Sequence, residues 1–363
     1  METTEKTTKN YVGIDVHKKM LEVARLRDSA GKIERQTFTT GGEGITHLLE
    51  WLTPEDVIAL ETGNQSFRLA KTLILKGFDA IVLNAGDLAV IYKSLKKTDR
   101  EDALKLARLI SRIPREELPL VEIPSDEMED ARRLSTEQAT WTKQRTALIN
   151  RLHSIFTQAG RTEITKKDLS SINNREKVVC LLSTRYISEA KRLCQMINHF
   201  ETMLAAVHFE INQLLDKELS FTTLAMSMPG VGPVTALVLF SYLGDCRRFS
   251  NGKQVAYYAG FVPRVDSSGD TIRYGGIIKH GAQGIRRVMV QSAWSLVHSK
   301  NGNELTLFYE RLKATKGKGK AIVAVARKML CVFYAMMTSG ELYRGVELED
   351  IFKKIKNYGI HNF

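Results

Sequence analysis

Two long stretches without proline or internal glycine restrict the possible folds of this chain most strongly. They run from Asp126 to about Gly160 and from Ser183 to about Leu219. Apolar residues recur there at three- and four-residue spacing, which predicts two long amphipathic helices. The helices could pack as an antiparallel hairpin or as an intermolecular coiled coil. We favour a spacer that also dimerises over a catalytic role.

These helices divide the chain into three expected domains, residues 1–125, 126–220 and 221–363. The chain has 53 basic and 41 acidic side chains, a formal charge of +12, which favours a polyanionic partner. The first domain carries 19 basic and 19 acidic residues, the second 14 and 13, and the third 20 and 9. The third domain is therefore expected to do most of the polyanion binding.

Composition excludes several classes of protein. With 43% hydrophobic residues and no low-complexity tract, the chain is not disordered or collagen-like. No apolar run approaches the roughly 20 residues that span a bilayer, and residues 1–10 lack the apolar core of a signal peptide. We expect a soluble cytoplasmic protein with no membrane partner. The scattered cysteines indicate reduced thiols with structural roles: Cys180, Cys194, Cys246 and Cys331.

The first domain alternates strand and helix patterns. Strands are expected at 11–16, 20–27, 33–39, 56–60 and 80–83, and helices at 45–51 and 67–75. The order β-β-β-α-β-α-β predicts a mixed sheet covered by helices, as in ribonuclease-H-like folds. The fold class is therefore α/β at the N-terminus, followed by a mostly α-helical remainder.

Four carboxylates fall at informative places in this domain. Asp15 interrupts an apolar strand and Glu61 ends another, and a strand carboxylate is costly to desolvate unless it is paired or bound to a cation. Asp99 and Asp102 share one face of a helix that Thr98 caps, although acids in a first helical turn also stabilise the helix dipole. Together the four acids could bind Mg²⁺ ions for phosphodiester chemistry.

The third domain begins with a Gly-x-Gly turn at Gly230 and Gly232, ahead of an apolar helix. Such a turn frees backbone N–H groups that bind phosphate, as in a helix-hairpin-helix-like element, although an ordinary helix–helix turn has the same pattern.

A polar loop with Ser267 and Ser268 follows, and a serine there is usually only a turn residue. Nearby cations could stabilise the charge of a phosphoryl group attacked by a serine hydroxyl. The candidate nucleic-acid-binding cations are Arg264, Arg273, Lys279, Arg286, Arg287, Lys316, Lys318, Lys320, Arg327 and Lys328. Lys316 to Lys320 are expected to form a flexible basic loop before a helix.

The motifs occur in the order of a known family. They are Gly13-Ile14-Asp15-Val16, Leu60-Glu61-Thr62-Gly63, Asp99-x-x-Asp102-Ala103, Pro229-Gly230-Val231-Gly232-Pro233 and Tyr258-Ala259-Gly260-Phe261-Val262-Pro263, followed by Ser268-Gly269. In this combination the chain resembles the DEDD transposases of the insertion-sequence-110 family over nearly its whole length.

The resemblance implies a RuvC-like N-terminal domain in which Asp15, Glu61, Asp99 and Asp102 bind Mg²⁺. It also implies that residues 221–363, after the long-helix coiled-coil segment that the periodicity predicts, form a transposase domain with Ser268, rather than Ser267, as the nucleophile. Such a serine would attack DNA at the element ends and target through a phosphoserine intermediate. The family also implies homodimers or homotetramers with shared active sites, and a non-coding bridge RNA as guide.

Two other functions stay open at the level of sequence. In a metal-only nuclease or Holliday-junction resolvase, the four carboxylates would cut DNA and Ser268 would be a loop residue. In a non-catalytic nucleic-acid-binding protein the acid cluster would have decayed, and the intact set of four acids argues against that function.

Overall fold

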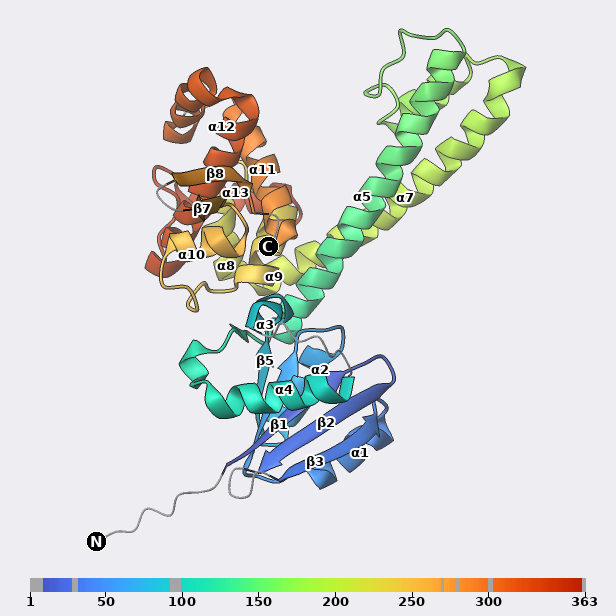
Figure 1. Ribbon diagram of the computed structural model, residues 1–363. Coiled ribbons are helices and arrows are strands. Elements are labelled where there is room, and N and C mark those ends of the chain that lie inside the picture. Colours follow the sequence, from blue (N-terminus) through green and yellow to red (C-terminus); the bar gives the residue numbers. More distant parts are fainter. Residues whose placement is uncertain are drawn as a thin grey trace. The chain divides into compact units, whose positions relative to one another are not determined.

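The computed structural model describes residues 9–27, 32–91, 99–268, 271–278, 281–299 and 303–360 (Figure 1). Side chains at 89–91, 99–100, 265–268, 271, 272 and 274 lie outside that description. The chain forms two compact units, 1–125 and 126–363, which we call unit 1 and unit 2.

Unit 1 is built on a six-stranded mixed sheet. Its strands are β1 (Asn10–Val16), β2 (Met20–Arg27), β3 (Ile33–Thr39), β4 (Asp56–Glu61), β5 (Asp79–Leu83) and β6 (Leu120–Val121), in the order β3-β2-β1-β4-β5-β6. β1 to β3 form an antiparallel meander, β4 and β5 run parallel to β1, and β6 pairs antiparallel with β5. The predicted ribonuclease-H-like mixed sheet is therefore confirmed, with β6 as an edge strand that the sequence pattern did not reveal.

Helices cover both faces of this sheet. α1 (Gly42–Trp51) and α2 (Ser66–Leu75) bury Leu48, Leu69 and Leu73 against alternate strand residues such as Ile14 and Ile58. The opposite face packs on α4 (Asp99–Arg112). The short α3 (Ala85–Ile91) and the 3₁₀ turn η1 (Arg115–Glu117) complete the unit. Residues alternate between the two sheet faces, so the central strands β1, β4 and β5 are buried on both sides, whereas β3 is mostly exposed.

Helix α4 lies unusually close to the sheet because small residues face it. Ala59, Gly13 and Ala24 are register partners across β4, β1 and β2 and form one row of small side chains. A Cβ atom added at Gly13 would lie 2.0 Å from the carbonyl oxygen of Ala103 and 2.7 Å from the amide nitrogen of Ala107 in α4. The absence of a side chain at Gly13 therefore sets the position of α4.

Unit 2 contains the two predicted long helices, α5 (Asp126–Gln158) and α7 (Thr184–Lys217), which pack as an antiparallel hairpin within one chain. Trp141 and Phe200 meet between them with ring centroids 5.6 Å apart. The guanidinium of Arg145 lies 2.6 Å from a carboxylate oxygen of Glu201. The hairpin alternative is thus confirmed, while dimerisation through this segment stays a prediction.

The distal end of the hairpin has its own small core, closed by α6 (Ile172–Val179). Arg175 of α6 is fully buried, 2.7 Å from a carboxylate oxygen of Glu201. It also donates to the carbonyl of Leu169 and to Asn198 Oδ1, at 2.8 and 2.6 Å. Arg175 and Arg145 hold the pKa of Glu201 below its ordinary value despite burial. A buried ion pair such as Arg175–Glu201 stabilises the fold only while both partners are present and charged.

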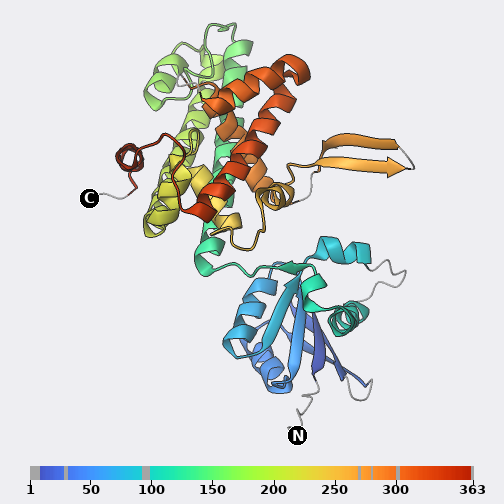
Figure 2. The ribbon, with the colours of Figure 1, turned by 90° about the vertical axis from the view of Figure 1, so that its left-hand side faces the viewer.

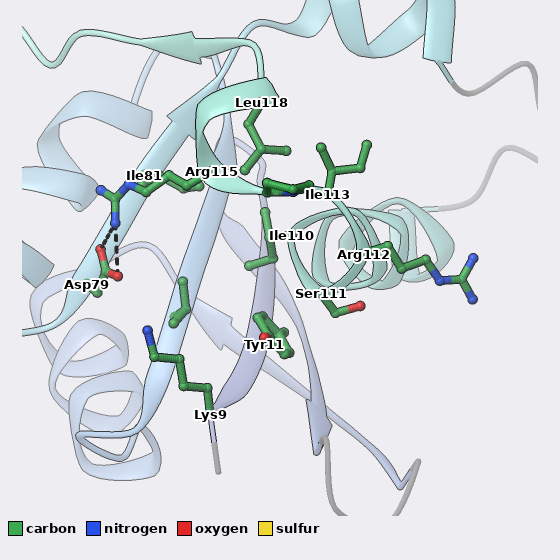
Figure 3. Close-up of a pocket in the computed structure, with 12 residues that line it drawn as sticks. Lys9, Tyr11, Asp79, Ile81, Ile110, Ser111, Arg112, Ile113, Arg115 and Leu118 are labelled. Carbon is green, nitrogen blue, oxygen red and sulfur yellow. Dashed lines mark hydrogen bonds and ion pairs between the residues drawn. The ribbon is translucent and has the colours of Figure 1, made fainter. Parts of the chain in front are cut away.

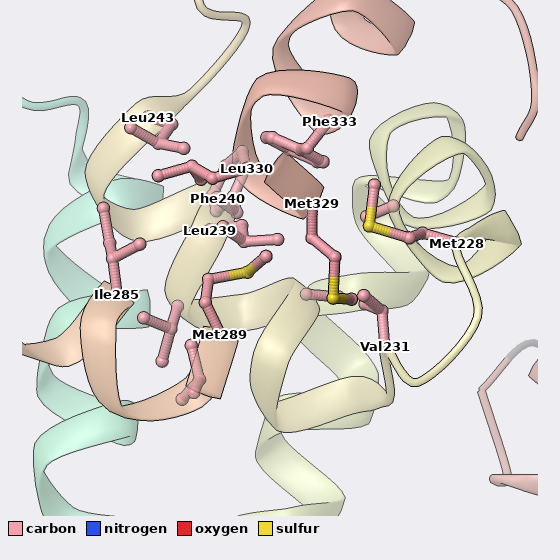
Figure 4. Close-up of a cluster of buried hydrophobic side chains, with 14 of the residues drawn as sticks. Met228, Val231, Leu239, Phe240, Leu243, Ile285, Met289, Met329, Leu330 and Phe333 are labelled. Atoms are coloured by element: carbon pink, nitrogen blue, oxygen red, sulfur yellow. The ribbon is translucent and has the colours of Figure 1, made fainter. Parts of the chain in front are cut away.

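The body of unit 2 is mostly helical. It comprises α8 (Leu219–Ser227), α9 (Pro233–Leu243), α10 (Gly252–Tyr258), β7 (Pro263–Ser268), β8 (Thr271–Ile277), α11 (Gln283–Val297), α12 (Glu304–Ser339) and α13 (Leu348–Asn357). Leu239, Met289, Met329 and Phe333 meet in its core (Figure 4). Residues from the base of the hairpin, including Leu215, belong to the same core, so residues 126–220 and 221–363 form one compact unit.

Helix α12 reverses direction at one residue. Gly317 is non-helical, with φ +77° and ψ 162°, and the ammonium of Lys328 lies 4.8 Å from the ring centroid of Phe308, so the two halves pack together. The prediction of a flexible loop over 316–320 is therefore wrong, because only Gly317 departs from helical geometry. Glycine allows the chain to reverse at this single position.

The second half of α12 is also long and apolar enough to cross a membrane by composition, which the sequence analysis did not recognise. In the structure, 44% of an apolar 18-residue stretch of this helix is buried. Val325, Met329 and Phe333 are fully buried in the core. The hydrophobicity of this segment is thus accounted for by packing within unit 2.

We expect Gly13→Ala to destabilise unit 1 by about 1–3 kcal/mol, because the new methyl group overlaps the backbone of α4. The measurement is the free energy of unfolding from urea titration. Gly42→Ala is the matched control, since a Cβ at Gly42 meets no atom within 4 Å and alanine is favoured in a helix. Equal stability of the two variants would contradict the role assigned to the close contact.

Candidate active site

Two of the predicted metal ligands lie at the carboxyl ends of neighbouring strands. β1 and β4 are parallel, and Ile14 pairs with Leu60. Asp15 and Glu61 are the next residues on the two strands, so they lie side by side at one edge of the sheet. Side chains alternate along a strand, so both residues share the face of Ala59, which α4 covers.

Helix α4 brings the other two acids towards the same edge because it runs antiparallel to β1. Ala103 of α4 lies against Gly13, whereas Ile110, two turns later, lines the same hollow as Tyr11 near the start of β1. The first turn of α4 therefore lies at the carboxyl end of β1. Asp102 immediately precedes Ala103 on this helix.

Two of the described acids have nearby nitrogen-bearing side chains. A carboxylate oxygen of Asp15 lies 3.2 Å from Nε2 of His17, and one of Asp102 lies 2.6 Å from the ammonium of Lys105. The Asp15 and Asp102 side chains are 19% and 28% exposed. Asp99 is the first residue of α4, and its side chain lies outside the described residues.

These residues fit a divalent cation by the chemistry of their donors, since carboxylate oxygens are the ligands that hard cations prefer. Among the described side chains, no three His, Cys, Asp or Glu groups are close enough together to hold a metal ion. Lys105 is paired with one oxygen of Asp102 and would compete with a metal ion for that oxygen.

The predicted nucleophile lies on a two-stranded ribbon formed by β7 and β8, which projects from the body of unit 2 (Figure 2). Ser268 ends β7 and pairs with Thr271, and Asp266 pairs with Arg273. Register positions alternate between the two faces, so Ser268 and Arg273 occupy the same face and Ser267 the other. The side chains of both serines lie outside the described residues. Arg264 and Arg273 are exposed on the ribbon.

The Gly-x-Gly turn joins α8 to α9 and packs tightly. Gly230 has φ +81°, and a Cβ there would lie 2.3 Å from the carbonyl oxygen of Ser292 in α11. Gly232 is the N-cap of α9. The sequence analysis missed Lys354, whose ammonium donates to the carbonyls of Met226 and Val231 at 2.7 and 2.8 Å. Burial lowers the pKa of Lys354 to about 8.

The predicted phosphate-binding cations are spread over unit 2. Arg286 donates to the carbonyl of Ala259 at 2.8 Å, and Lys328 stacks on Phe308, so both have structural roles. Arg287 is exposed and lines two hollows of unit 2. The remaining described cations are the half-buried Arg327 and the exposed Lys316, Lys318 and Lys320 around Gly317. Lys279 lies outside the described residues.

Unit 1 has a further hollow of about 380 Å³ beside the C-terminal end of α4, at the opposite end of the helix from Asp102 (Figure 3). Ile110 and Tyr11 form part of its wall, and Arg115 is paired with Asp79 at 2.8 Å on its rim. None of the four predicted metal ligands lines it.

Comparison with known proteins agrees with this arrangement. Residues 12–160 match the DEDD transposase family model, and residues 222–310 match the model of the IS116/IS110/IS902 transposase family. The chain is 28% identical to the transposase for insertion sequence element IS1111A of Coxiella burnetii, over 70% of each chain. It is 25% identical to the pilin gene-inverting protein of Moraxella lacunata, over 91% of this chain and 96% of the relative.

A third relative is the transposase for insertion sequence element IS1328 of Yersinia enterocolitica, 24% identical over 78% of this chain and 82% of the relative. The family models fall on both units of the chain, and the DEDD domain implies a divalent metal ion and a DNA substrate. The chain therefore belongs to the IS110/IS116/IS902 family of transposases, DNA strand-transfer enzymes, and contains the family's DEDD transposase domain.

Proposed function

We propose that this transposase cuts and exchanges DNA strands through a covalent phosphoserine formed by Ser268, assisted by Mg²⁺ held by Asp15, Glu61, Asp99 and Asp102. The observation that carries the metal assignment is the shared edge of the sheet. Asp15 and Glu61 end adjacent parallel strands, and the first turn of α4 lies at the same end. This arrangement supports a single metal site supplied by β1, β4 and the start of α4.

The register of the ribbon supports Ser268 over Ser267 as the nucleophile. Ser268 takes a position on the same face as Arg273, whose guanidinium can stabilise negative charge on a phosphoryl oxygen. Ser267 takes a position on the other face, paired with Ile272.

In the proposed cutting step the Ser268 hydroxyl oxygen forms a bond to the phosphorus of a DNA phosphodiester. The bond from phosphorus to the 3′ oxygen breaks, and the serine proton is lost as the 3′ oxygen gains one. The products are a serine-linked 5′ phosphate and a free 3′ hydroxyl. In strand exchange another 3′ hydroxyl attacks that phosphate, and the serine hydroxyl is restored.

The carboxylates act on the same chemistry by binding and orienting. Bound Mg²⁺ would activate the attacking oxygen and stabilise the leaving one. Asp15 and Glu61 stand on rigid strands and Asp102 on a helix fixed by the close contact at Gly13, so the ligands are held by regular structure rather than by loops.

We further propose that a non-coding bridge RNA guides the protein and that homodimers or homotetramers share active sites. The family membership supports both, as does the excess of basic residues in 221–363, where 20 Lys and Arg stand against 9 Asp and Glu. The pilin gene-inverting relative shows that a similar protein inverts a DNA segment.

Incubation with element-end DNA and Mg²⁺, followed by denaturation, should give a covalent protein–DNA adduct that is absent from Ser268→Ala. The reason is that the phosphoserine bond survives denaturation and that Ser268 is the only nucleophile in the proposed cutting step. Ser267→Ala is the matched control and should still form the adduct, which denaturing gel electrophoresis detects.

An adduct that persists in Ser268→Ala would remove Ser268 as the nucleophile. Normal cleavage by the wild type with no adduct at all would instead favour the metal-only nuclease or resolvase.

Asp102→Asn should lower the rate of DNA cleavage by about 100-fold or more while leaving DNA binding intact, because an amide is a weaker ligand for a hard cation. Glu101→Gln is the control, since Glu101 is the adjacent acid of α4 and pairs with Arg35 at 3.0 Å instead. Cleavage rates and fluorescence anisotropy measure the two properties. Equal losses in both variants would reject Asp102 as a metal ligand.

Ribonuclease treatment of the protein purified from its host should abolish cutting at specific sites, because base pairing with the guide would carry the specificity. Sequence-independent DNA binding should remain, since it depends on backbone charge. Unchanged site-specific cutting after complete RNA removal, checked by sequencing the cleavage products, would eliminate the bridge RNA from the proposal.

A further inference from the structure

Two hollows of unit 2 lie beside α5 and α11 and have Arg287 as a common lining residue. One has a volume of about 830 Å³ and runs past Thr140, Lys143 and Tyr258. The other has a volume of about 620 Å³ and reaches the Gly230–Gly232 turn. Arg287 lines both, so the two hollows share a wall. We call them together the α5/α11 groove.

The lining of the groove is polar and suits an anion. Gln283, Arg287, Gln291 and Ser295 succeed one another at four-residue spacing and form one stripe on α11. Hydroxyl and amide side chains of α5 face them, namely Ser135, Thr136, Gln138, Thr140 and Thr142. No aspartate or glutamate is among the described residues that line either hollow.

Of the cations that line the groove, Arg287 and Lys143 are available to a ligand, whereas Lys354 is bonded to the carbonyls of Met226 and Val231. Arg287 and Lys143 are exposed, and within the described part of unit 2 neither has a hydrogen-bond or ion-pair partner. Arg286, the next residue of α11, differs because it is bonded to the carbonyl of Ala259. A guanidinium in an acid-free groove is typical of sites that bind phosphate.

Two tyrosine rings supply an aromatic surface in the same groove. Tyr242 and Tyr258 both line its wider part and are half-buried. Arg132 lies 5.1 Å from the ring centroid of Tyr242, and Arg248 lies 4.9 Å from that of Tyr258, so arginines hold both rings in place. Rings fixed beside cations are suited to stacking with unpaired bases.

We propose that the α5/α11 groove binds single-stranded DNA, with its phosphates at Arg287 and Lys143 and its bases against Tyr242 and Tyr258. This inference rests on the proposed function, since a strand detached for exchange is the single strand that the reaction provides. Duplex DNA fits the groove less well, because its bases are stacked on one another and cannot present a free face to the tyrosines. The groove is thus a holding site for the strand rather than a site of bond cleavage.

The test uses the full-length protein freed of nucleic acid, with a metal chelator present so that no cutting occurs. A labelled oligothymidine of about 15 nucleotides covers one site of this kind. Arg287→Ala should weaken its binding by about tenfold, the usual cost of one charge-assisted contact. It should also reduce the slope of log affinity against log salt by about 0.7, the value for one contact on a single strand.

Arg192→Ala is the matched control for charge, since Arg192 is an exposed arginine of α7 outside both hollows. Its effect should be less than about twofold, the size of a distant screened charge. Thr140→Trp should block the groove and weaken binding, whereas Thr146→Trp, at another exposed threonine further along α5, should not. Circular dichroism confirms that each variant is folded.

Equal losses of oligothymidine affinity in Arg287→Ala and Arg192→Ala would overturn the proposal, because they would reflect net charge alone. Tighter binding of a duplex or of oligouridine than of oligothymidine, with the same dependence on Arg287, would assign the groove to another nucleic acid and reject the proposal. The result is independent of Ser268, whose adduct assay needs Mg²⁺ and cleavable DNA. Either assay can therefore fail without the other.

Discussion

The contact between helix α4 and the small-residue row of the sheet determines the geometry of the candidate metal site. Ala59, Gly13 and Ala24 present almost no side chain, so the backbone of α4 lies directly on β1. A larger residue at Gly13 would push the helix away, and Asp102 with it. The glycine of the Gly-Ile-Asp-Val motif therefore has a packing role that serves Asp15, two residues further along the strand.

The sequence predicted the parts of the molecule whose signals are local. Strand and helix periodicity located the sheet of unit 1 and the two long helices of unit 2, and the carboxylates at strand ends indicated a shared edge. Features that depend on contacts between distant segments were missed. Arg175 is an ordinary arginine in the sequence, and only the fold shows that it is buried on Glu201. Lys354 likewise gains its role from carbonyls more than 120 residues away.

Charge is divided between the units according to the chemistry of each. Residues 1–125 have equal numbers of acidic and basic side chains, and the predicted metal ligands all lie there. The excess of cations lies after residue 220, but the structure shows that these cations are not equivalent. Arg286 and Lys328 are engaged in internal contacts, whereas Arg287 faces an acid-free groove. Net charge therefore indicated a polyanionic partner, and burial and hydrogen bonding distinguish the residues able to contact it.

Strand transfer by the proposed mechanism uses a nucleophile, a cation site and a site that binds the released strand. Under the proposed assignments the cation site belongs to unit 1, whereas the β7–β8 ribbon and the α5/α11 groove both belong to unit 2. A strand bound in the groove would stay with the unit that carries its serine-linked end. Because no carboxylate is among the described residues that line the groove, binding of a strand there should require no bound Mg²⁺. Holding and cutting are then separate properties of the chain, so a strand held in the groove need not dissociate between the two chemical steps.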